Sequence, residues 1–248
     1  VTFSDGKPTR GASFQVRGAN SIGAGGSTLV LIDGVEGDLN SVDASQIDQI
    51  SVLKDAASAA IYGSRAANGV ILITTKRADK GKFAVTYRGY VGWQSPVVYP
   101  DVVNAEEYMH LSRRASENDG AVSLYTDEYI ANYRRNNYLD PDAYPIIDWQ
   151  DQLMTGNGFT HNHTLSMSAG SERIRVMTSL GYLDQNGIIK NANFKRYNLR
   201  NNMDIRMNDR LNFRLDIAAT YSRRAANPYQ SSVFGFMNSK DPLMLAQW

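Results

Sequence analysis

The sequence predicts a transmembrane antiparallel β-barrel whose first strands follow a small α/β unit. Two observations predict the barrel: several segments alternate apolar and polar side chains over about ten or more residues, and the links between these segments are short and long in turn. A third observation sets the α/β unit apart, because residues 1–80 carry short elements broken by glycines and lack this long alternation. We therefore expect one domain over 1–80 and the start of the barrel over 81–248.

The α/β unit is predicted from short runs bounded by turn residues. Strands are expected for "SFQVRG", "TLVLIDG", "QISVLKD" and "GVILITTKR". "DASQ" at 43–46 has the spacing of a helix-capping box. The small residues of Ala56–Tyr62 predict a short helix that Gly63 would end.

The barrel strands are predicted from alternation with a period of two residues. The pattern occupies 82–93, 159–170, 173–183, 196–207 and 211–222. In the fourth segment, Leu199, Met203 and Ile205 alternate with polar residues that include arginines. Such segments exceed the ~5 to 6 residues of an ordinary strand and match the ~9 to 11 that cross a bilayer at a tilt. The charged face suits a hydrated lumen and the apolar face suits lipid, with Trp93 and Tyr221 near the ends of strands.

The links between the strands predict which end of the barrel lies outside. "GSER" and "NDR" are tight turns, whereas 94–158, 184–194 and the residues after 224 are longer links. Short periplasmic turns and long external loops are typical of outer-membrane barrels. The first long link is large enough for helices, and Asn104 with Glu107 has capping-box spacing there.

Composition excludes several classes of protein. The 248 residues carry a net charge of +1 without a strong basic cluster, so we expect no nucleic-acid partner. The chain has no cysteine, which excludes disulfides and thiolate chemistry, and no apolar run approaches the ~20 residues of a membrane helix. The sequence begins and ends abruptly, so we expect a fragment of a longer protein.

Several ordered motifs together resemble a known family. "RGANS", "LVLIDGV", "IDQISVLKDAASAAIYGSRAANGVILITTKR" and "VTYRGYVGW" follow one another between residue 17 and residue 93. This order resembles the plug-to-barrel junction of TonB-dependent outer-membrane transporters, and more narrowly the SusC/RagA class of Bacteroidota. The resemblance implies that 1–80 is the C-terminal part of a plug inside the barrel. It also implies a complete barrel of about 22 strands, of which about five are present here.

The resemblance implies a function and partners as well. It implies active import of oligosaccharides across the outer membrane, driven by TonB and assisted by a SusD-like surface lipoprotein. Import of oligopeptides by the same mechanism is the alternative, and a secreted carbohydrate-binding or hydrolytic β protein is a further alternative from another class. The segment that contacts TonB is expected before Val1, and outer-membrane lipid would surround the barrel. We expect no cofactor and no enzymatic activity.

Candidate contact residues follow from the resemblance and from composition. Three basic residues of the plug are expected to reach acidic groups on the barrel wall: Arg17, Lys54 and Arg65. Asn20 and Ser21 lie in a glycine-rich loop that the resemblance places near the binding cavity. The motif "DPDAYPIIDW" of the first long link adds Tyr144, Asp148 and Trp149, a composition suited either to sugar binding or to packing of the loop itself.

Other charged and metal-ligating residues leave their roles open. The four arginines of the polar strand faces would attract an anionic or hydroxyl-rich cargo, neutralise Asp204 and Asp216, or pair with the plug; they are Arg196, Arg200, Arg206 and Arg214. His161 and His163 share one face of a strand, as two metal ligands would, but their place near a strand end favours interfacial side chains, and we expect no metal site. The carboxylates of "DGVEGD" lack the spacing of a calcium loop and are interpreted as turn residues.

Overall fold

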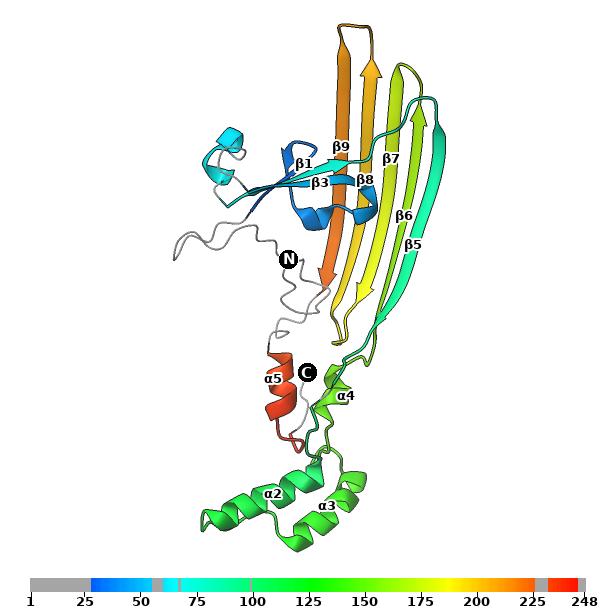
Figure 1. Ribbon diagram of the computed structural model, residues 1–248. Coiled ribbons are helices and arrows are strands. Elements are labelled where there is room, and N and C mark those ends of the chain that lie inside the picture. The colour runs from blue at the N-terminus through cyan, green and yellow to red at the C-terminus, as the bar shows by residue number, and fades with distance from the viewer. Residues whose placement is uncertain (1–27, 55–59, 67, 99, 226–231, 245–248) are drawn as a thin grey trace. The chain divides into compact units, whose positions relative to one another are not determined.

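The computed structural model describes residues 28–54, 60–66, 68–98, 100–225 and 232–244 (Figure 1). These residues form two compact units, one containing the two β-sheets and the other the α-helices of the long links. Each unit is described by itself. The predicted strand "SFQVRG" lies outside the described residues, as do Ala56 to Ala59 of the predicted helix.

The first sheet forms the α/β unit that the sequence predicts. It contains β1 (Leu29–Ile32), β2 (Val35–Glu36), β3 (Ile47–Leu53) and β4 (Val70–Thr75) in the order β2-β1-β4-β3. β1 and β4 are parallel, and the other two pairs are antiparallel. The turn between β1 and β2 has positive φ at both Asp33 and Gly34, the backbone that tight hairpins favour and that Asp-Gly pairs adopt readily.

Both faces of this sheet are covered by packed apolar residues. Leu29, Leu31 and Val70 pack with Ala66 on one face, whereas Ile32, Ile71 and Ile73 pack with Val42 on the other. Alternate residues of the same strands supply the two clusters, as expected for a sheet that is buried on both sides.

Three short 3₁₀ helices complete the unit. They are η1 (Leu39–Ser41), η2 (Ala44–Gln46) and η3 (Ala60–Ala66). Asp38 and Asp43 cap the first two by accepting backbone N–H bonds, so the cap predicted at 43 is present although the helix is a single 3₁₀ turn. η3 is kinked at Gly63, whose φ of 70° an L side chain rarely adopts. The described part of the predicted helix is therefore also 3₁₀.

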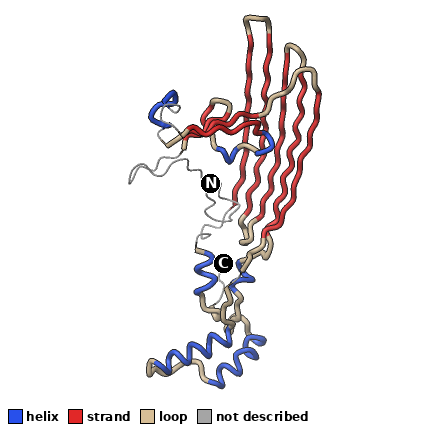
Figure 2. Tube along the Cα trace, in the orientation of Figure 1, coloured by secondary structure: helices blue, strands red, loops and turns tan. Residues whose placement is uncertain are grey.

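The second sheet contains five long strands that lie side by side in sequence order (Figure 2). They are β5 (Phe83–Gln94), β6 (Gly158–Gly170), β7 (Ile174–Asn186), β8 (Asn193–Arg206) and β9 (Asn212–Ala225). β6 to β9 pair antiparallel without a break in register. Their lengths of 12 to 14 residues confirm the predicted membrane-spanning strands.

Two connections of this sheet differ from simple expectation. β7 reaches Asn186 and β8 begins at Asn193, so the link between them is shorter than the predicted 184–194 because the strands are longer. At the opposite end, a Cβ on Gly170 would lie 1.9 Å from the carbonyl oxygen of Asp79. Only glycine fits this close approach, which lets the segment leaving the first sheet hydrogen-bond to the end of β6.

The helical unit comes from the long links. It contains α2 (Ala105–Asn118), α3 (Asp127–Leu139), α4 (Trp149–Leu153) and α5 (Val233–Ser239). The capping box of Asn104 and Glu107 is formed, as predicted. Met109, Ile130 and Tyr133 make its core. No helix in the described part of the chain is long and apolar enough to cross a membrane.

Candidate functional site

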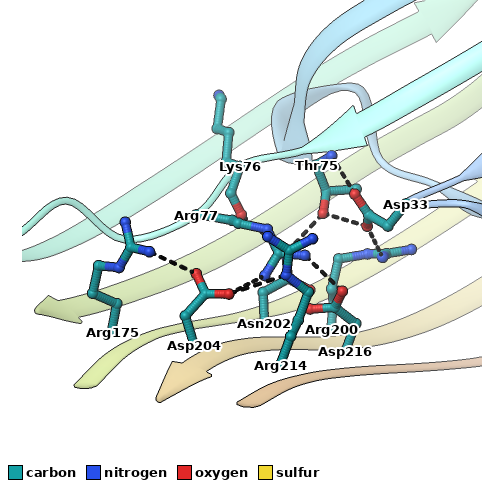
Figure 3. Close-up of polar contacts among 10 residues, drawn as sticks. All are labelled: Asp33, Thr75, Lys76, Arg77, Arg175, Arg200, Asn202, Asp204, Arg214 and Asp216. Carbon is teal, nitrogen blue, oxygen red and sulfur yellow. Dashed lines mark hydrogen bonds and ion pairs between the residues drawn. The ribbon is translucent and has the colours of Figure 1, made fainter. Parts of the chain in front are cut away.

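The candidate site is the polar contact between the first sheet and one face of β6 to β9. Residues of even number on β8 point toward the first sheet, whereas those of odd number point away from it, because successive side chains alternate across a strand. Figure 3 shows the part of this contact that surrounds the end of β4. We call this set of residues the latch: Asp33, Thr75, Lys76, Arg77, Arg175, Arg200, Asn202, Asp204, Arg214 and Asp216.

The most sheltered pair of the latch joins Asp33 to Arg200. The Arg200 guanidinium donates to Asp33 Oδ2 over 3.0 Å, and the two side chains are 12% and 6% exposed. Asp33 also accepts from the backbone N–H of Thr75 at 2.8 Å and from its hydroxyl at 2.6 Å. The positive φ of Asp33 therefore places a carboxylate with three donors between the two sheets.

Asn202 extends this contact along β8. Its side-chain amide donates to Thr75 Oγ1 at 2.7 Å and to the carbonyl oxygen of Lys76 at 3.0 Å. The residue is 3% exposed, and its Oδ1 has no hydrogen-bond partner among the described residues. A buried acceptor without a hydrogen bond costs free energy. The amide nitrogen of Asn202 is therefore held by two bonds, whereas its oxygen is unpaired among the described residues.

Arg77 forms the charged end of the latch. Its guanidinium contacts Asp204 at 3.2 Å and Asp216 at 2.6 Å, on two adjacent strands. Asp204 is in turn contacted by Arg175 of β7 and by Arg214 of β9. Arg77, which lies just after β4, thus bridges carboxylates of two adjacent long strands within a network of mixed charge (Figure 3).

A second group of contacts joins the η1 and η2 region to the same strand face. Asp43 accepts from Asn162 at 3.1 Å and lies 3.4 Å from the Thr164 hydroxyl. Burial raises the pKa of Asp43, but the hydrogen bonds from Ser45 and Asn162 outweigh it and hold the pKa below its ordinary value. Gln46 donates to Ser179 at 3.1 Å, and Arg196 donates to the backbone carbonyl of Asn40.

The contacts of the lumen arginines select among the roles left open by the sequence. Arg196 bonds to Asn40 of η1 and Arg200 to Asp33 in the turn between β1 and β2. Arg214 pairs with Asp204, and Arg206 pairs with Asp209 of the neighbouring turn. These contacts correspond to plug pairing and charge neutralisation. The positions of the four arginines are therefore explained without a contact to the cargo.

The predicted plug contacts occupy other positions. Arg17 lies outside the described residues, and so do Asn20 and Ser21. Lys54 follows β3 and is exposed. Arg65 pairs with Glu36 at 2.6 Å within the first sheet's own unit, with both side chains exposed. Contact between these three basic residues and the barrel wall stays a prediction, whereas Arg77, which the sequence did not single out, makes such a contact.

The predicted residues of the long link are used in local packing. Trp149 is 5% exposed, donates from its indole nitrogen to the carbonyl of Asp241, and meets the Phe236 ring edge-on. Asp148 caps α4 through the N–H groups of Gln150 and Asp151. Tyr144 packs edge-on against Tyr133. These contacts fit the packing interpretation, and direct contact with a substrate stays a prediction.

A pocket of about 410 Å³ lies beside two of these residues within the helical unit. Its walls include Val103, Tyr108, Asp148, Trp149, Lys240 and Pro242. The lining mixes apolar residues with charged and amide side chains, which include Asp101, Asn104 and Asn238. The pocket keeps Asp148 available as a candidate, since its second carboxylate oxygen has no cap bond in the described structure.

The two histidines lie on the face of β6 that points away from the first sheet. His161 Nδ1 lies 3.2 Å from His163 Nε2, and His163 Nδ1 lies 2.6 Å from the Tyr87 hydroxyl. Within the described ranges, no group of three or more His, Cys, Asp or Glu side chains is arranged to hold a metal ion. The ring contacts place both histidines among aromatic residues of this face, and their interfacial role stays a prediction.

Comparison with known proteins finds similarity to TonB-dependent receptors. Residues 1–70 match the family model of the TonB-dependent Receptor Plug Domain. The chain is 36% identical over 208 residues to the TonB-dependent receptor SusC of Bacteroides thetaiotaomicron, covering 79% of this chain and 19% of SusC. It is 34% identical over 218 residues to a TonB-dependent receptor of Formosa agariphila, covering 85% and 21%. The chain thus spans about a fifth of the length of these curated relatives.

Solved structures give the same assignment for the fold. The RagAB peptide transporter superimposes with a TM-score of 0.77 at 26% identity, over 90% of this chain and 27% of the matched chain. The RagAB peptide importer in its 'open-open' state superimposes with a TM-score of 0.75 at 27% identity. The first sheet therefore corresponds to plug and the five long strands to barrel wall.

Proposed function

Because this chain belongs to the SusC/RagA class of TonB-dependent receptors of the outer membrane, we propose that the whole protein imports oligosaccharides across that membrane. Import is active and depends on TonB, and a SusD-like surface lipoprotein assists it. The chain itself contributes plug over 1–80 and the beginning of the barrel over 81–248. It carries no enzymatic role.

The latch is the observation that supports import. A transporter of large solutes needs a wide barrel that stays closed until energy is supplied, and a plug held by hydrogen bonds and ion pairs meets that need. Arg77 and Arg200 connect the plug with β8 and β9 through contacts of 2.6 to 3.2 Å. Such polar contacts break and re-form more readily than a continuous apolar interface would.

The choice of cargo rests on sequence similarity. Oligosaccharide is the cargo that the resemblance to the SusC/RagA class implies, and the 36% identity with SusC supports a place in that class. The likeness to a peptide importer supports oligopeptides as the second candidate. The pocket beside Asp148 and Trp149 supplies aromatic, apolar and charged groups that either cargo would use.

Calorimetric titration of the full-length receptor with its lipoprotein partner tests this proposal. The titrants are a panel of oligosaccharides and a panel of peptides of similar length. Heat of binding confined to one glycan family supports the proposal. Peptide binding without a glycan response transfers the assignment to the second candidate, and binding of neither panel contradicts both.

The loop candidates have their own control in the same experiment. Asp148→Asn removes the charge at the pocket but keeps an oxygen that caps α4. A weaker cargo affinity for this variant, beside unchanged affinity for Asp119→Asn at the end of α2, would support direct contact. Equal affinities would assign Asp148 to capping alone.

A further inference from the structure

We propose that the outward face of β6 to β9 carries a binding strip for the phosphate group of an outer-leaflet lipid. The outward face is the one that points away from the plug. The strip rests on the outer-membrane assignment and on the orientation in which the short turns are periplasmic. It does not depend on the identity of the cargo.

The register of the strands arranges outward side chains in rows across the sheet. Leu165, Leu180, Leu199 and Ala219 are direct cross-strand partners, and so are Ala169, Val176, Met203 and Leu215. These rows and the row of Ile174, Ile205 and Phe213 near the turns are apolar. A polar pair, Thr178 and Asn201, lies between the first two of these rows. The Asn201 amide donates to the Thr178 hydroxyl at 2.7 Å, so the two polar groups bond to each other. This stretch suits the hydrocarbon of a bilayer.

The next row toward the external end consists of rings. We call it the ring row; it contains Tyr87, His163, Tyr182, Tyr197 and Tyr221. Neighbouring ring centroids lie 4.9 to 6.5 Å apart across all five strands. Amphipathic rings of this kind prefer the level of the lipid headgroups, so the ring row marks the boundary of the hydrocarbon.

Two residues further toward the external end of β6 to β9, on the same face, lies a row that contains charged side chains. The charged row contains His161, Asp184, Lys195 and Arg223, which are cross-strand partners in that order. Lys195 Nζ contacts Asp184 Oδ2 at 3.0 Å, and the Tyr182 hydroxyl donates to the same oxygen at 3.0 Å. Asp184 thereby fixes Lys195 directly above the ring row.

The charges of this row match an anionic partner. The row contains two positive charges, on Lys195 and Arg223, and one negative charge, on Asp184. The Lys195 side chain is 41% exposed, and an ammonium group has two further donors beyond its bond to Asp184. Arg223 is exposed, and its side chain makes no hydrogen bond or ion pair with the residues that the structure describes. Its guanidinium is free to bind a phosphate in two-pronged fashion.

The level of Lys195 and Arg223 along the strands indicates that the phosphate belongs to a lipid. A charged side chain on the outward face is costly in hydrocarbon but nearly free at the interface, where the stem packs on apolar neighbours and the head reaches the headgroups. Lys195 and Arg223 are two residues from Tyr197 and Tyr221, which is the spacing that places them at headgroup level. A phosphate reached from this position belongs to the surrounding leaflet.

The opposite end of the same face lacks this arrangement. Glu172 pairs with Lys80 at 3.7 Å there, and both side chains are largely exposed. Within the described strands, no row of rings crosses the sheet at that end. The strip is therefore confined to one end of the sheet. Basic residues at the other end serve as the matched control.

Native mass spectrometry of the delipidated full-length receptor tests the strip. The receptor is titrated with diphosphoryl lipid A and, separately, with the same lipid after removal of its phosphates. The test variant is Lys195→Gln with Arg223→Gln, and the control is Lys80→Gln with Arg210→Gln at the turn end. We expect the affinity for the diphosphoryl lipid to fall about fivefold for each charge removed in the test variant, and to stay unchanged in the control. Arg223→Lys should retain most of the affinity.

Three results would overturn the proposal. The first is equal lipid affinity of the test variant and the unmodified receptor, and the second is equal affinity for the phosphorylated and dephosphorylated lipids. The third is displacement of the lipid by inorganic phosphate at equal concentration, which would assign the strip to a free anion. If the double variant does not fold, Arg223→Gln alone serves, because Arg223 contacts no described polar partner. Cargo binding measured in parallel separates failure of the strip from failure of the proposed function.

Discussion

On the plug side of β8, Arg200, Asn202 and Asp204 each bond to residues of the plug or of neighbouring strands, whereas Leu199, Met203 and Ile205 on the opposite side belong to apolar rows. The two sets alternate along one strand with the same backbone. The difference teaches that the charges of the lumen face already have partners: some of them hold the plug, as Arg200 and Asp204 do, and others pair within the barrel wall. The apolar side chains form the face that we expect to contact lipid.

The largest expected effect comes from the sheltered pair. Asp33→Asn keeps a residue that tolerates positive φ but leaves Arg200 without its counter-charge, so we expect the plug to lose about 3 kcal/mol of stability against local unfolding. Hydrogen exchange at the amides of Ile71 and Ile73 in the full-length receptor measures this loss. Glu36→Gln is the matched control, because the Glu36 to Arg65 pair is exposed and should contribute less than about 1 kcal/mol. Equal losses of stability in the two variants would contradict the claim that the sheltered Asp33 to Arg200 pair contributes more than the exposed Glu36 to Arg65 pair.

A charge on the outward face should be almost as damaging, for a different reason. Leu199→Arg places a guanidinium in an apolar row, and we expect the free energy of folding into lipid vesicles to weaken by about 2 to 4 kcal/mol. Urea-dependent folding monitored by tryptophan fluorescence provides the measurement. Leu199→Met keeps the volume and should cost less than about 1.5 kcal/mol. Tolerance of Arg at 199 would contradict the assignment of this face to lipid.

Loss of the bridging arginine should loosen the plug without unfolding the wall. Arg77→Met removes charged hydrogen bonds to Asp204 and Asp216, but Asp204 keeps its contacts with Arg175 and Arg214, so we expect a loss of about 2 kcal/mol. We expect more frequent openings in single-channel recordings across planar bilayers. Arg77→Lys should be intermediate, because a lysine keeps the charge but cannot reach both carboxylates with a planar fork. Unchanged conductance in both variants would show that the latch does not control leak.

The smallest expected effect concerns Asp43. Its folded pKa lies below the ordinary value of 3.8, so the unfolded carboxyl binds a proton first as the pH falls. The stabilising contribution is therefore complete above about pH 5 and is lost progressively as the pH falls through 3.8 and on through the lower folded pKa. Thermal unfolding of the plug at a series of pH values should show this loss, and Asp43→Asn should lack it. A variant with the same pH profile as the unmodified receptor would exclude Asp43 as the source.

Much of the fold follows from the sequence because its signals are local. The alternation of Leu199, Met203 and Ile205 with polar neighbours determines which side of β8 faces lipid, and the Asn104 to Glu107 spacing determines where α2 begins. The family of the chain follows from the motif between Val52 and Arg77. Both kinds of signal lie within a single stretch of residues.

The contacts of the plug did not follow from the sequence. Asp33 and Arg200 are 167 residues apart, and nothing within either motif specifies the other. Arg65 and Arg77 lie in the same motif with similar neighbours, yet the first pairs with Glu36 and the second with Asp204 and Asp216, because only the turn of the chain after β4 directs Arg77 at the wall. Trp149 looked equally suited to cargo and to packing, and its burial depends on Phe236, a residue of a different link.

The most direct test of the central claim is a double-mutant cycle between Asp33 and Arg200 in the full-length receptor. Asp33→Asn, Arg200→Gln and the double variant are compared by the hydrogen-exchange stability of Ile71 and Ile73. If the lumen charges hold the plug, the two substitutions should show a coupling free energy of at least about 1.5 kcal/mol. Additivity to within about 0.5 kcal/mol would show that the two side chains act independently, and the lumen charges would then need another explanation.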